Sequence, residues 1–76
     1  MSYLEDQEAL EALVTRMLVK AAQCIVTEIE YSKKKSSEEE LAWWVSTNHG
    51  YYLITVDKDG NAFYSKGGDA AWVSLY

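Results

Sequence analysis

The 76-residue sequence has no proline, a single cysteine and four glycines. Cys24, being alone, excludes an internal disulfide and a cysteine-rich metal site, which fits a reducing compartment and makes the cytoplasm the expected location. The sequence also lacks a basic N-terminal region followed by an apolar run, and it lacks an uncharged apolar stretch of about 20 residues. We therefore expect neither a signal peptide nor a membrane span.

Positive charge is also scarce. Seven lysines and arginines stand against twelve aspartates and glutamates, which gives a formal net charge of -5. Such a chain repels nucleic-acid phosphates and anionic lipids, so we expect no direct nucleic-acid binding and no membrane binding. The partner that this charge favours is a protein with a basic or apolar surface.

Apolar residues are plentiful, at 49% of the chain. This content can offset the entropy of an ordered chain, so the composition is that of a folded domain and not of a disordered tail. The length leaves room for one small domain, and we expect residues 1–76 to form a single α+β unit.

An apolar stripe with helical spacing runs through the first third of the chain. Its members recur at three- and four-residue steps and are Leu10, Leu13, Val14, Met17, Leu18, Ala21, Ile25 and Ile29. The pattern predicts a long N-terminal helix from about residue 4 to residue 30, with Glu5 and Glu8 near the positive end of its dipole. Residues 24–31 are rich in β-branched side chains and also alternate, so a break near residue 22 followed by a strand is the alternative.

The predicted length of this helix has a consequence for assembly. A helix of 27 residues is about 40 Å long, whereas a globule of this chain length is about 30 Å across. We therefore expect the end around Ile29 to pack on a second copy or on a partner, unless the helix breaks.

Residues 36–40 read Ser-Ser-Glu-Glu-Glu, which contains a capping-box pattern in two registers. This pattern predicts a short second helix over residues 41–47 that ends at Asn48–Gly50. A strand over Trp43–Thr47 is the competing interpretation, because Val45 and Thr47 are β-branched.

The last third of the chain has the pattern of a β-meander. Tyr51–Val56 and Asn61–Lys66 flank the turn sequence Asp57–Gly60, and a second turn at Gly67–Asp69 precedes a third strand within residues 71–76. The predicted architecture is thus α+β, with a long N-terminal helix, a short second helix and a three-stranded antiparallel β-meander.

Candidate catalytic and metal-binding residues are few. Asp57–Asn61 resembles half of an EF-hand loop, but Lys66 stands where the loop needs a bidentate glutamate, so we expect no calcium there. Cys24 and His49 have no nearby partner that would form a nucleophile–base pair. We expect a protein that is not an enzyme and that has no cofactor, no metal ligand and no catalytic residue.

Aromatic residues are the main functional signal. Eight of the ten lie in the last 34 residues, and tyrosine and tryptophan dominate protein interfaces. The candidate partner-binding residues are Trp43, Tyr51, Tyr64, Trp72 and Tyr76, together with Glu5, Glu8, Glu11 and Ile29 of the N-terminal segment. The alternative is that the aromatic side chains only complete a small core.

These features predict a small acidic non-enzymatic factor of the inhibitor, immunity, anti-defence or adaptor type, which acts by surface contact with a larger protein. One alternative is a structural subunit that forms a homo-oligomer, such as a homodimer, through the N-terminal helix. A further alternative is a small ligand-binding domain or enzyme.

Overall fold

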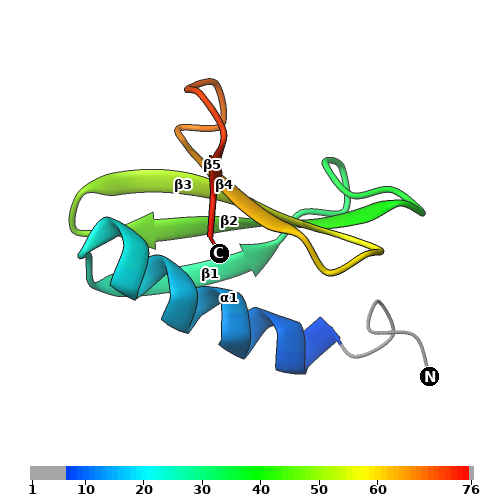
Figure 1. Cartoon of the computed structure of the whole chain (residues 1–76). Coiled ribbons are helices and arrows are strands. Elements are labelled where there is room, and N and C mark those ends of the chain that lie inside the picture. The colour runs from blue at the N-terminus through cyan, green and yellow to red at the C-terminus, as the bar shows by residue number, and fades with distance from the viewer. Residues whose placement is uncertain (1–6, 76) are drawn as a thin grey trace.

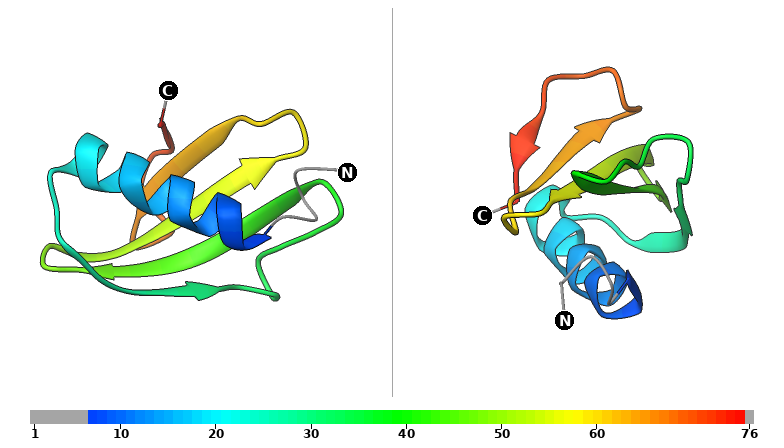
Figure 2. Two further views of the ribbon diagram at one scale, coloured as in Figure 1. Left: turned by 90° about the horizontal axis from the view of Figure 1, so that it is seen from below. Right: turned by 90° about the vertical axis from the view of Figure 1, so that its right-hand side faces the viewer.

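A computed structural model describes residues 7–75 and consists of a sheet with a helix across one face (Figure 1). The elements of this part of the chain are α1 (Gln7–Ala22), β1 (Val26–Tyr31), β2 (Glu40–Thr47), β3 (Gly50–Asp57), β4 (Ala62–Lys66) and β5 (Val73–Ser74). All strand pairs are antiparallel, and the strands lie in the sheet in their sequence order. Figure 2 shows α1 crossing the sheet obliquely.

The helix is shorter than the sequence pattern predicts. It ends at Ala22, and Gln23 then takes a left-handed conformation with φ 50°, which stops the helix and turns the chain back toward the sheet. Asn48 fixes the connection through two hydrogen bonds to Ile25. Its side-chain oxygen accepts from the backbone amide of Ile25 at 2.8 Å, and its backbone amide donates to the Ile25 carbonyl at 3.1 Å.

The prediction of continuous helix to residue 30 is therefore wrong, and the strand alternative is right from Val26 onward. The 16 residues of α1 span about 24 Å. This is less than the 34 Å long axis of the molecule, so within residues 7–75 the helix does not overhang the domain. Among the described residues, no helix is long and apolar enough to cross a membrane.

The predicted second helix is also wrong, because residues 40–47 form the strand β2. The serines that resemble a helix cap instead close the β1–β2 loop. Ser36 donates from its hydroxyl to the Ser32 carbonyl at 2.6 Å and accepts from the Ala42 amide at 2.9 Å, and the Ser37 hydroxyl accepts from the Glu39 amide at 3.2 Å. The loop thus uses the same capping chemistry without a helix.

The hairpin of β3 and β4 lies where the sequence predicts it. Asp57 accepts from the amides of Asp59 and Asn61, both at 2.9 Å, and Gly60 takes φ 87° at the left-handed position of the turn. The sheet nevertheless has five strands in place of the predicted three, because β1 and β2 extend the meander at its N-terminal side.

The core lies between α1 and one face of the sheet. Val14 and Leu18 of the helix are 1% and 0% exposed. Opposite them, alternate residues of the three central strands form the buried surface, and these are Leu41, Trp43, Val45, Tyr52, Ile54, Val56 and Ala62. Because side chains alternate between the faces of a strand, the residues between these point to the other side.

We call that other side the open face, because α1 does not cover it (Figures 1 and 2). The β4–β5 connection folds over its middle, where Gly68 lies against Trp44 and Leu53. The Ser65 hydroxyl fixes this connection by donating to the Ala70 carbonyl at 2.7 Å. The two ends of the open face are left uncovered by this loop.

Candidate functional site

The open face exposes several large aromatic side chains. Tyr51 on β3 is 64% exposed, Phe63 on β4 is 36% exposed, and Trp72 just before β5 is 48% exposed. Aromatic side chains are enriched in protein interfaces relative to the rest of the surface. The open face is therefore the candidate functional surface of the described chain.

The first hollow in this face, the Tyr51 hollow, lies over β1, β2 and β3. Its lining residues are Glu28, Glu30, Trp44, Ser46 and Tyr51, and its volume is about 190 Å³. Strand register explains the cluster, since Glu30 pairs with Trp44 and Ser46 pairs with Tyr51. The hollow thus combines two carboxylates with two aromatic rings.

The second hollow, the Trp72 hollow, lies over β2, β3 and β4 at the other end of the open face. Glu40, Thr55, Phe63 and Trp72 line a volume of about 370 Å³. Thr55 pairs with Phe63 in the sheet, so both side chains rise on the same face. Thr55 is only 9% exposed, and within residues 7–75 its hydroxyl makes no hydrogen bond.

The two hollows have the same chemical character, and both lie over β2 and β3. Tyr51 and Thr55 are four positions apart on β3, which places the hollows about 13 Å apart along that strand. Each hollow places at least one carboxylate beside aromatic rings. Such a pairing suits positively charged groups, because a carboxylate and the face of an aromatic ring both attract a cation.

Two of the predicted interface aromatics do not lie on this face. Trp43 is fully buried under α1, where its indole Nε1 donates to the Glu11 carboxylate at 3.2 Å and its ring meets Tyr31 edge-on at 6.0 Å. Tyr64 is half-buried on the helix side of the sheet, with its ring 5.8 Å from that of Tyr52. Both side chains therefore contribute to packing in the described chain.

The acidic and apolar candidates of the N-terminal segment lie apart from the open face. Glu8, Glu11 and Ile29 come together in a shallow groove between α1 and the edge strand β1, and Ala12, Thr15 and Arg16 complete its lining. The Glu11 carboxylate already accepts a hydrogen bond from Trp43, and Ile29 packs against the core. The predicted residues Glu5 and Tyr76 lie outside the described residues.

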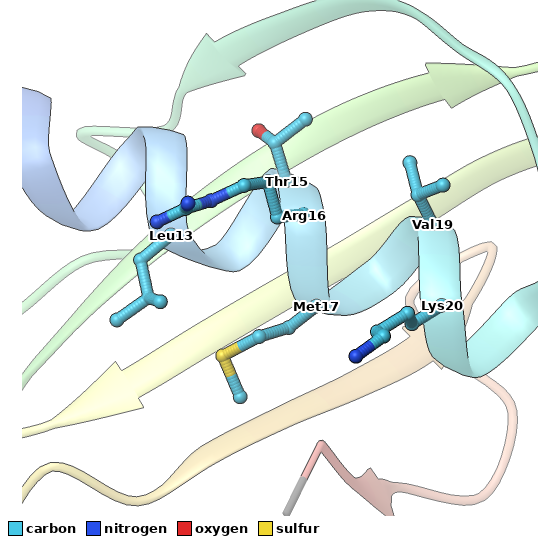
Figure 3. Close-up of a pocket in the computed structure, with 6 residues that line it drawn as sticks. All are labelled: Leu13, Thr15, Arg16, Met17, Val19 and Lys20. Carbon is cyan, nitrogen blue, oxygen red and sulfur yellow. The ribbon is translucent and has the colours of Figure 1, made fainter.

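A third surface feature is an apolar hollow along α1, which Figure 3 shows from outside. Leu13 and Met17 project from one side of the helix and Val19 from the other, and Arg16 and Lys20 add positive charge. Leu13 and Val19 are 38% and 39% exposed. The sequence pattern places Leu13 in the core-facing stripe, whereas the structure puts it at the edge of the core.

The remaining candidate residues have structural surroundings. Cys24 is buried, and this burial raises the pKa of its thiol, which disfavours the reactive thiolate. In the β3–β4 turn the amide of Asn61, followed by weaker donors, lowers the pKa of Asp57. Within residues 7–75 no three histidine, cysteine or acidic side chains are grouped closely enough to hold a metal ion.

Most residues of the hollows were not predicted from the sequence, and these are Glu28, Glu30, Glu40, Trp44, Ser46, Thr55 and Phe63. The alternation of polar and apolar residues along 40–47 could have indicated these residues, because in an extended strand Glu40, Trp44 and Ser46 lie on the same face. Because residues 41–47 were predicted to be a helix, this shared face was not recognised.

Comparison of the chain with protein-family models, with curated proteins and with solved structures finds no match.

Proposed function

We propose that this chain is a small acidic protein-binding module of the inhibitor, immunity, anti-defence or adaptor type, with no catalytic role of its own. The observation that carries the proposal is the open face, where Tyr51, Phe63 and Trp72 are exposed beside carboxylates. A partner with a basic and apolar surface would cover the rings and neutralise the carboxylates. The net charge of -5 supports the same class of partner, because it attracts basic proteins over a distance.

The proposed location is the cytoplasm. The support for it is that Cys24 is the only cysteine and stays a free thiol in the fold.

The experiment that tests the proposal begins with capture of a partner by the tagged chain from an extract of its source organism. Trp72→Ala and Tyr51→Ala should each weaken the captured complex by about 2 kcal/mol or more if they are interface hot spots. Leu13→Ala is the matched control, since Leu13 is a similarly exposed apolar residue on the opposite side of the molecule. If Leu13→Ala weakens the complex and the two aromatic variants do not, the interface is on α1 and the proposal is wrong.

A homo-oligomer formed through α1 is the second candidate, and the exposed Leu13 and Val19 favour it. The apolar hollow around them has a volume of about 580 Å³. The molecular mass in solution, measured over a range of concentrations, tests this candidate directly. A dimer that Leu13→Glu converts to monomers would support it, and a monomer at every concentration would exclude it.

A further inference from the structure

The Trp72 hollow holds an acceptor that no described residue satisfies. Thr55 is 9% exposed and its hydroxyl has no hydrogen-bond partner within residues 7–75, although it lines an open hollow. A hydroxyl group can accept a hydrogen bond as well as donate one. A donor that enters the hollow would supply the missing bond.

Glu40 lines the same hollow, and within residues 7–75 its carboxylate forms no ion pair. Glu40 pairs with Asp57 across β2 and β3, so a second acidic residue is its direct neighbour in the sheet. The ion pair at this end of the sheet, among the described residues, joins Lys58 to Glu39 at 2.8 Å and leaves Glu40 out. Glu40 can therefore accept hydrogen bonds from a visiting group.

Two aromatic rings complete the hollow. Phe63 and Trp72 are both accessible to solvent, at 36% and 48% exposure. An aromatic ring attracts a cation placed over its face, with tryptophan the strongest, and it also covers the aliphatic stem of a long side chain. An anion would be repelled by Glu40, and a purely apolar group would leave Glu40 and Thr55 without partners.

We propose that the Trp72 hollow binds the side chain of a lysine or arginine from the partner protein. Its ammonium or guanidinium group donates to the Glu40 carboxylate and to the Thr55 hydroxyl, while its aliphatic stem lies against Phe63 and Trp72. The inference rests on the proposed function for the source of the cation, a protein. The preference of the hollow for a cation can be measured without that protein.

The test uses three small probes with the full chain: N-acetyl-lysine-methylamide, N-acetyl-arginine-methylamide and the neutral analogue N-acetyl-norleucine-methylamide. Each is titrated at millimolar concentration and constant ionic strength, and the Trp72 indole N–H resonance is followed by NMR. We expect saturable shifts with the lysine or arginine probe and none with the norleucine probe. Equal shifts with all three probes would overturn the proposal.

Variants locate the binding. Glu40→Gln and Trp72→Leu should each weaken binding of the cationic probe by about two- to fivefold, the range for an exposed ion pair or cation–π contact. Glu38→Gln is the matched control, because it removes the same charge from an exposed loop residue outside the hollow and should leave binding unchanged. If Glu38→Gln and Glu40→Gln weaken binding equally, the probe responds to net charge and the site does not exist.

Thr55→Val tests the unpaired hydroxyl by a second readout. Valine keeps the shape and suits a strand, so this variant should weaken probe binding while it leaves the midpoint of thermal unfolding unchanged or raises it. A clear fall of that midpoint would mean that the hydroxyl is already paired in the folded chain, which contradicts the proposal.

The failure of this inference is distinguishable from the failure of the proposed function. If the cationic probes do not bind but Trp72→Ala still abolishes capture of a protein partner, the open face binds proteins and the lysine or arginine pocket is wrong. If the probes bind but neither Trp72→Ala nor Tyr51→Ala weakens capture of a protein partner, the protein-binding role of the open face is wrong.

Discussion

Trp43 and Trp72 provide the clearest test of which aromatic residues hold the fold and which are available for binding. Trp43 is fully buried and is the largest of the fully buried side chains, whereas Trp72 is 48% exposed. Truncating a buried tryptophan to alanine costs about 3–5 kcal/mol, because the lost contacts leave a cavity. A domain of this size has a total stability of about 4–11 kcal/mol, so Trp43→Ala should remove a large part of it.

Trp72→Ala should cost at most about 2.5 kcal/mol, because close to half of the side chain is already in water and only about 100 Å² of the roughly 200 Å² of a tryptophan is buried, at about 25 cal/mol per Å². The difference between the variants is therefore on the order of 2 kcal/mol. In urea, where stability falls by about 1 kcal/mol per molar, the unfolding midpoint of Trp43→Ala should lie about 2 M below that of Trp72→Ala.

The hydrogen bond of Trp43 can be separated from its volume. Glu11→Ala removes the acceptor of the indole Nε1 but leaves the ring packed against Tyr31, and it should cost about 1 kcal/mol. Equal urea midpoints for Trp43→Ala and Trp72→Ala would refute the placement of Trp43 beneath α1 and of Trp72 on the open face.

Three further predictions follow from the turns and from the buried thiol. Gly68→Ala should destabilise the fold by about 1–3 kcal/mol in urea unfolding, because φ at Gly68 is 84° and an added Cβ would lie 2.7 Å from the Trp44 ring. Gly60→Ala is the control: no atom lies within 4 Å of an added Cβ there, so this variant should show only the cost of the left-handed conformation. Cys24 should react with a thiol reagent only when the chain unfolds, because its side chain is buried from the reagent and this burial also raises the pKa of the thiol. Reaction of the native protein at the rate of the unfolded chain would contradict this. The folded pKa of Asp57 is lowered, so its contribution to stability is present above about pH 4 and is lost as the pH falls through the folded pKa; Asp57→Ala should be less stable than the parent at neutral pH, and the gap should shrink in acid.

The parts of the fold that could be predicted from sequence are those fixed by local chemistry. The β3–β4 hairpin is an example, because Asp57 caps the turn and Gly60 supplies the left-handed residue whatever the rest of the chain does. The helix α1 is another, since the spacing of Leu10, Val14 and Leu18 matches the period of a helix. The structure buries Val14 and Leu18 against the sheet and packs the partly buried Leu10 beside them.

The failures occur where local and long-range preferences conflict. Residues 36–40 carry the side chains of a helix cap, yet Trp43 and Val45 are buried only when their segment pairs with strands on both sides. Pairing on both sides satisfies the backbone of β2 and places three of its apolar side chains in the core, which outweighs the local signal. The helix prediction for residues 25–30 failed similarly, because Asn48, 23 residues farther along the chain, fixes the turn that precedes β1.

The candidate site depends on these same long-range pairings, and this explains why sequence reasoning found only part of it. Tyr51 and Trp72 could be selected as exposed candidates from composition, but the carboxylates beside them come from other strands. Glu40 lines the Trp72 hollow only because β2 is a strand paired with β3. Trp72 lines it only because the chain turns back after β4. A single changed register would move Glu40 to the core face and separate it from Thr55. The chemistry of the hollow is thus a property of the strand register, so substitutions that shift the register of β2 should abolish cation binding even when every lining residue is retained.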